Sequence, residues 1–261
     1  QGPSLVCYND SVFSPADLHA ISRIGQDSKV ERPSTTGRFG LGFNAVYHFT
    51  DIPSFVSGEY LVYFDPHACN LPGTTPAAPG LKIKFGGTGL VHQFPDQFQP
   101  LMQFGCNLTN AYDGTLFRFP LRTEATAARS EIKKQAYTPQ DVLRLFENFK
   151  SLASESLLFL KRVQKVSFYI RESEDSQPQL YYRADLKVPT TGGSSHGGRD
   201  PRQSAVDFVC GTAARPVSKK GLMQKLASTN ERSLPMGCGQ VEVYLTHVEG
   251  RDFDLSKRGR E

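Results

Sequence analysis

The 261-residue chain contains no tryptophan, only five cysteines and no long run of apolar residues. The cysteines are scattered, odd in number and without Cys-x-x-Cys spacing, which argues against a disulfide framework and against a cysteine-based zinc site. We therefore expect a reducing, cytoplasmic compartment. No segment approaches the roughly 18 apolar residues that a membrane-spanning helix needs, so no membrane span is expected.

Strong charge is also lacking. The formal net charge is +4, and the basic pairs at residues 219–220 and 257–258 are too short to indicate a nucleic-acid partner. With 38% hydrophobic residues, including 18 phenylalanines and 10 tyrosines, the chain can bury a sizeable core. The length predicts one large domain, or one domain with a smaller appendage.

Glycine, in contrast, is concentrated in one informative stretch. Gly37, Gly40 and Gly42 lead into an apolar run over residues 40–49, which predicts a buried core helix. Glycines and a helix N-terminus present backbone N–H groups that suit an anion such as phosphate. Lys29 or Arg38 could add positive charge. The alternative is a loop that only caps the helix, with Gly42 required by close helix–sheet packing and Lys29 as a solvated charge.

Upstream of the glycines, a polar turn joins a strand to a helix. Residues 4–8 form a short apolar run, Asn9 and Asp10 follow, and a helix is predicted over residues 15–24. Ser14 suits the N-cap of that helix. An acidic residue at such a turn can bind a ligand, or it can stabilise its own backbone in an Asx-turn.

Downstream, Gly114 and Thr115 open an alternating strand over residues 116–121. This order of segments resembles the nucleotide-binding domain of the GHKL superfamily, which includes the ninety-kilodalton heat shock proteins. The residues are more similar still to the chaperone-like repeats of the sacsin family. The resemblance covers most of residues 1–172, and its clearest stretches are residues 24–29, 36–51, 115–122 and 159–166.

The resemblance implies an α+β fold, a GHKL-type mixed β-sheet covered by helices on one face in a two-layer α/β sandwich. It also implies ATP or ADP as the ligand, with Mg²⁺. Asp10 would recognise the adenine base, or Asn9 would do so if the register shifts by one. Thr115 would contact the base or Asp10, unless it is a simple β-branched strand residue. The predicted nucleotide-binding residues are Asn9, Asp10, Lys29, Gly37, Arg38, Phe39, Gly40, Gly42, Phe43 and Thr115.

The chain departs from the superfamily pattern in two motifs. No Glu-x-x-x-Asn occurs, although that motif activates water and holds magnesium in the superfamily. Because the chain begins just before the second motif, we expect the first motif and the metal ligand to lie outside it or to be lost. The second motif of the superfamily is Asp-x-Gly-x-Gly, and residues 9–13 of this chain contain neither glycine. Val12 and Phe13, which stand in place of the glycines, would crowd the adenine. We therefore predict weak or no nucleotide binding and no ATPase activity by this chain alone.

The remaining patterns suggest three regions. Residues 1–188 are predicted to form the chaperone-like domain, residues 189–203 a Gly/Ser-rich flexible connector, and residues 204–261 a poorly defined extension. A helix is predicted from Thr138 to about residue 160, with Leu145 and Leu152 on its apolar face. Strands are predicted over residues 163–170, 180–188 and 240–248.

Two functions from different classes are compatible with these observations. The first is a chaperone-type nucleotide-binding module whose lid closure signals to other parts of a large protein. The second is a degenerate scaffold module that has lost nucleotide and holds client segments or neighbouring repeats. The expected partners are other domains of the same large protein, chaperones and client proteins. A Glu-x-x-x-Asn motif upstream in a longer chain would favour the first function.

Overall fold

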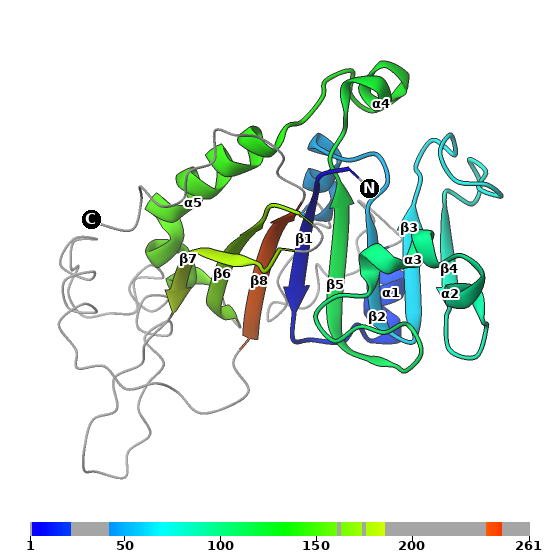
Figure 1. The fold of residues 1–261 in the computed structure, drawn as a ribbon, viewed down its shortest axis with the longest axis horizontal. Coiled ribbons are helices and arrows are strands. Elements are labelled where there is room, and N and C mark those ends of the chain that lie inside the picture. Colours follow the sequence, from blue (N-terminus) through cyan, green and yellow to red (C-terminus); the bar gives the residue numbers. More distant parts are fainter. Residues whose placement is uncertain (1, 22–41, 161–162, 174–175, 186–238, 247–261) are drawn as a thin grey trace, which may run out of the picture.

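The computed structural model describes residues 2–21, 42–160, 163–173, 176–185 and 239–246. Its centre is one eight-stranded sheet in the order β4-β3-β2-β5-β1-β8-β6-β7 (Figure 1). Paired strands run antiparallel, except that β6 and β8 are parallel. The strands are β1 (Ser4–Asn9), β2 (Ser54–Gly58), β3 (Tyr60–Phe64), β4 (Gly80–Lys84), β5 (Tyr112–Pro120), β6 (Val163–Arg171), β7 (Gln179–Asp185) and β8 (Gly239–Thr246).

Helices accompany this sheet and confirm the predicted α+β class. Two of them, α1 and α5, begin at a proline that follows a hydroxyl N-cap, as the sequence predicted. The helices are α1 (Pro15–Ile21), the 3₁₀ helix η1 (Phe43–His48), α2 (Leu90–Gln93), α3 (Pro95–Phe98), the 3₁₀ helix η2 (Gln99–Leu101), α4 (Glu124–Arg129) and α5 (Pro139–Phe159).

The two faces of the sheet bury different clusters. Successive strand residues point to opposite faces, so Leu5 joins one cluster and Val6 the other. We call the face that carries Leu5, Phe55 and Phe119 the first face, and the opposite face, which carries Val6 and Leu116, the second face. Both faces therefore contribute to the core.

The longer helices and η1 pack on the first face, and a segment with shorter helices covers part of the second. On the first face, α5 contributes Val142, Phe146 and Leu157 to the core, and Phe146 lies 4.5 Å from Phe168 of β6 between ring centroids. On the second face, α3 and η2 contribute Phe98 and Leu101. In Figure 1, α2 and α3 lie in front of the β2–β4 end of the sheet and α1 lies behind it.

The helix predicted over residues 40–49 is wrong in length and in burial. The described part of that stretch forms only the six-residue 3₁₀ helix η1, and none of its residues is fully buried. Its last turn is closed by bonds from Phe49 and Thr50 to the carbonyl of Val46. Apolar residues without sidedness predicted a buried helix, whereas only one side of η1 packs on the first-face cluster: Phe43 and Val46 contact it, and Ala45 and His48 are exposed.

Helix α5 follows the prediction at both ends but not on its outer face. Thr138 and Asp141 form a capping box, in which each side chain accepts the backbone N–H of the other residue. Leu145 and Leu152, predicted on the apolar face, are 45% and 55% exposed. They lie seven residues apart on the side of α5 that faces away from the first-face cluster, so the apolar stripe is broader than the buried contact.

Strand β8 takes a central position although it is far along the chain. It lies between β1 and β6, antiparallel to β1 and parallel to β6 (Figure 1). The strand predicted over residues 240–248 is thus found at Gly239–Thr246. The predicted connector at residues 189–203 and the rest of the extension lie outside the described residues, so the three-region organisation stays a prediction.

Candidate functional site

Strand β1 ends in the turn that the sequence singled out. The side-chain oxygen of Asn9 accepts the backbone N–H of Ser11 at 3.1 Å, which forms an Asx-turn. Asn9 is the register partner of Thr115 on β5, so both residues belong to the first face. Asp10 is exposed on this turn. The turn is therefore built by Asn9, and adenine recognition by either residue stays a prediction.

A pair of buried hydroxyls fixes the chain after this turn. Thr115 is fully buried, and its hydroxyl donates to the carbonyl of Ser11 at 2.6 Å. Because that bond uses its only hydrogen, Ser57 is the donor in the 2.8 Å contact between the two hydroxyls, or donates to the Gly114 carbonyl at 3.2 Å. Ser57 also accepts the backbone N–H of Phe13 at 2.8 Å. Strands β2 and β5 thus hold residues 11–13 against the sheet.

The side chain of Phe13 lies on the first face among other aromatic rings. Its ring centroid is 5.1 Å from that of Phe55 and 6.0 Å from that of Phe117. Val12, the neighbouring residue, is 46% exposed. The substituted second motif therefore anchors an aromatic residue on the sheet, and Phe13 is part of the core packing at this end of the first face.

Gly42 and Phe43 are the predicted nucleotide-binding residues of the glycine-rich stretch that the structure describes. The backbone of Gly42 has ordinary helical angles (φ −62°, ψ −42°), and no described atom lies within 4 Å of a Cβ added there. Contact with the described sheet therefore does not require a glycine at this position. Phe43 packs on Phe64 and Phe117, with centroids 5.1 and 6.2 Å away. The other predicted nucleotide-binding residues of this region, Lys29, Gly37, Arg38, Phe39 and Gly40, lie outside the described residues.

Sequence comparison relates this arrangement to known proteins. The sequence profile of the Sacsin domain matches residues 1–183. The chain belongs to the Sacsin domain family. Over 225 residues it is 36% identical to human (Homo sapiens) Sacsin, an alignment that covers 84% of this chain. The chain spans about 5% of the length of that relative.

In the described part of this Sacsin-family chain, no helix is long and apolar enough to cross a membrane. No group of three or more His, Cys, Asp or Glu side chains within that part is placed to hold a metal ion. Cys7, Cys69 and Cys106 are free thiols.

A buried arginine that the sequence did not single out secures the end of η1 in this Sacsin-family fold. The side chain of Arg122 is fully buried and donates to the carbonyls of Tyr47 and His48, each at 3.0 Å. It also forms a two-point ion pair with Asp51, with one bond of 2.8 Å from Nε. The backbone N–H of Arg122 bonds to the carbonyl of Phe49 at 2.8 Å. Arg122 therefore fixes the chain that follows the glycine-rich stretch.

A second buried charge organises the loop after β3. Asp65 is fully buried and accepts the backbone N–H groups of Asn70 and Leu71, both at 2.8 Å. The N–H of Cys69 and the hydroxyl of Thr74 add longer bonds at 3.3 Å. Burial by itself would raise the pKa of the Asp65 carboxyl, but the bonds from Asn70, Leu71 and Cys69 outweigh burial and lower the pKa below its ordinary value.

This lowered pKa predicts acid sensitivity. A carboxyl whose pKa is lower in the folded state stabilises the fold above its unfolded pKa of about 3.9 and loses that contribution as pH falls through its folded pKa. Asp65→Asn is therefore expected to be less stable than the parent chain at neutral pH and closer to it at about pH 3. Urea unfolding at both pH values measures the difference. Asp113→Asn, at an exposed position of β5, is the control; an Asp65→Asn deficit that is equal at both pH values would contradict the assignment.

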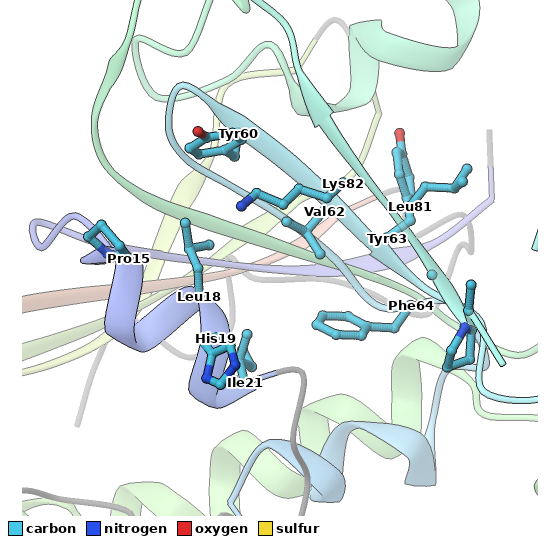
Figure 2. Close-up of a pocket in the computed structure, with 13 residues that line it drawn as sticks. Pro15, Leu18, His19, Ile21, Tyr60, Val62, Tyr63, Phe64, Leu81 and Lys82 are labelled. Carbon is cyan, nitrogen blue, oxygen red and sulfur yellow. The ribbon is translucent and has the colours of Figure 1, made fainter. Parts of the chain in front are cut away.

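Beside the aromatic rings of the first face, α1 and the β3–β4 hairpin enclose a groove of about 540 Å³. Leu18 and Ile21 of α1 form one wall, and Val62 and Phe64 of β3 form the floor (Figure 2). The rim carries Lys82 of β4. In Figure 2 the side chains of these residues converge on the same space, whereas Tyr63 and Leu81 point away from it. The sequence offered no signal for this groove, because its walls are far apart along the chain.

Proposed function

We propose that this Sacsin-family chain is a chaperone-like module of a longer protein that holds polypeptide segments and does not depend on nucleotide. The observation that carries the proposal is the placement of Phe13. Its ring packs on Phe55 and Phe117, and its backbone is bonded to the Ser57–Thr115 hydroxyl pair. Those groups lie where the resemblance predicts the floor of an adenine pocket, and the two hydroxyls form their hydrogen bonds with each other and with the backbone of residues 11–13.

The proposal treats ATP or ADP with Mg²⁺ as weak ligands at most. Gly37, Gly40 and Gly42 would still offer backbone N–H groups to a phosphate. A base that activates water contributes about 100- to 10,000-fold in rate, and the chain has no Glu-x-x-x-Asn to supply it. Hydrolysis would need a glutamate and a magnesium-holding asparagine from elsewhere in a longer protein. Nucleotide binding coupled to lid closure is the second candidate, favoured by the glycine pattern alone.

The proposed partners are client polypeptides, other chaperones and the other domains of the same long protein. A partner that is a neighbouring domain is consistent with the small share of human Sacsin, about 5%, that this chain matches. The cytoplasm is the proposed location, which suits the scattered cysteines.

Suppression of aggregation tests the function. Heat-denatured citrate synthase is followed by light scattering with the 261-residue chain, alone and with MgATP, and with an equal mass of ribonuclease A as the control. We expect the chain to reduce scattering when it is equimolar with citrate synthase, to the same extent with and without MgATP, while ribonuclease A does not. No suppression, or suppression only with MgATP, would refute the proposed function.

A further inference from the structure

The open edge of β4 borders the groove between α1 and the β3–β4 hairpin, since Gly80 and Lys82 line that groove. Among the described residues β4 is the last strand of the sheet at this end. The carbonyl of Pro79 and the N–H of Phe85 bond toward β3. Because backbone groups alternate along a strand, those of Gly80, Lys82 and Lys84 point toward the open edge. This edge therefore offers a row of donors and acceptors on which another strand can be built.

The groove side of β4 has a gap and a positive charge two residues apart. Gly80 has no side chain, and a Cβ there would meet the carbonyl oxygen of Tyr63 at 2.6 Å, so the close approach of β3 and β4 requires glycine. The apolar floor of Val62 and Phe64 is thus left open beside Gly80. An aromatic side chain from an added strand can fill such a gap, as aromatic partners do beside edge glycines.

Lys82 supplies the charge. Its Nζ lies 4.1 Å above the ring centroid of Tyr60, and no ion pair joins it to a described carboxylate. Lys84, in contrast, is paired with Glu59 at 3.0 Å. Lysines on an edge disfavour pairing with a purely apolar strand. They therefore select an occupant that carries a carboxylate opposite Lys82.

We propose that this groove and edge bind an extended polypeptide segment that adds to β4 as an antiparallel strand, with a carboxylate opposite Lys82 and an aromatic residue opposite Gly80. Because antiparallel partners run in reverse order, the recognised pattern is acidic residue, any residue, aromatic residue. This inference rests on the proposed function, since it names the segment that the chaperone-like module would hold. Backbone bonds to β4 supply affinity, and the two groove-facing side chains supply specificity.

The test uses a fluorescein-labelled peptide of sequence Ser-Thr-Val-Glu-Val-Phe-Val-Thr-Ser and fluorescence anisotropy with the 261-residue chain. We expect saturable binding that falls as salt rises, because a charge pair contributes. An N-methyl group on the phenylalanine, whose N–H would face β4, should abolish binding. The same group on the central valine, whose N–H would face away, should leave affinity unchanged. Equal effects of the two methyl groups, or no binding of the parent peptide, would refute strand addition.

Charge exchange tests the role of Lys82. Lys82→Glu is expected to weaken binding of the parent peptide by about tenfold and to be rescued by a peptide with lysine in place of glutamate. Lys150→Glu is the matched control, because Lys150 also lies over a tyrosine ring, at 6.0 Å from Tyr182, but on α5. Thermal melts by circular dichroism verify that both variants fold. Equal affinities of the parent chain and Lys82→Glu for both peptides would overturn the inference.

The outcomes separate this inference from the proposed function. If the chain suppresses aggregation of citrate synthase but does not bind the peptide, only the groove assignment fails. If it does neither, the proposed function fails as well. Suppression that is lost in Lys82→Glu and kept in Lys150→Glu would support both.

Discussion

Arg122→Ala is expected to lower the free energy of unfolding by about 3–5 kcal/mol, because removing one partner of a buried ion pair leaves the other charge uncompensated. Asp51 would lose its counter-ion, and the carbonyls of Tyr47 and His48 would lose their donor. For a domain of this size the loss corresponds to a fall of roughly 10 °C in Tm. Thermal and urea unfolding, followed by circular dichroism, measure both quantities.

A surface arginine provides the control for this prediction. Arg144→Ala breaks the ion pair with Asp141, but the Arg144 side chain is 77% exposed. Exposed pairs contribute about 1 kcal/mol or less, so this variant should remain close to the parent chain. Comparable losses in the two variants would mean that the contacts of Arg122 with Asp51 and with the end of η1 do not stabilise the fold as the geometry indicates.

Phe55→Ala is expected to have a similarly large effect, with a loss of about 3–5 kcal/mol. Phe55 is fully buried, and its ring contacts those of Phe13, Phe64 and Phe117 at centroid distances of 5.1, 6.1 and 5.4 Å. The substitution removes that packing and leaves a cavity on the first face. Urea unfolding measures the loss.

Phe94→Ala is the matched aromatic control, because Phe94 is 48% exposed. Surface substitutions of this kind usually change stability by less than about 0.5 kcal/mol. A loss at Phe55 no greater than the loss at Phe94 would show that the aromatic cluster is not part of the core. That result would also remove the main reason for regarding the first face as filled by the protein itself.

Local sequence signals located the elements whose ends are set by their own side chains. The Thr138–Asp141 box and the proline that follows marked the start of α5, and Ser14 with Asp17 marked the start of α1 in the same way. Such caps bond within four residues, so they can be identified from the sequence. Alternation of apolar residues located the strands for the same local reason.

Contacts between distant segments could not be identified in this way. The end of η1 is held by Arg122, which lies more than seventy residues away in the sequence. The alternating residues around Arg122 indicated only a strand. The exposure of Leu145 and Leu152 depends on how broadly α5 meets the sheet. The insertion of β8 between β1 and β6 depends on pairing across the whole chain. Residue periodicity contains none of this information.

In the candidate site, too, local features could be predicted from the sequence, and contacts between distant segments could not. The Asx-turn at Asn9 follows from residue type, and the bulk of Phe13 was apparent from the replaced glycines. That Thr115 and Ser57 use their hydroxyls to bind the backbone of residues 11–13 requires β2 and β5 to be adjacent, which no local pattern indicates. The pairing of strands therefore determines what the second motif can do.

Titration of the 261-residue chain with MgADP, followed by the shift in Tm, tests the central claim most directly. A ligand that binds only the folded state must stabilise it, and a Kd weaker than about 5 mM gives less than about 0.4 kcal/mol at about 5 mM ligand. We predict a shift of about 1 °C or less, alike for the parent chain and for Gly42→Val. A concentration-dependent rise of several degrees that Gly42→Val abolishes would contradict the account, because it would show that the glycine-rich stretch and the first face form a working nucleotide pocket.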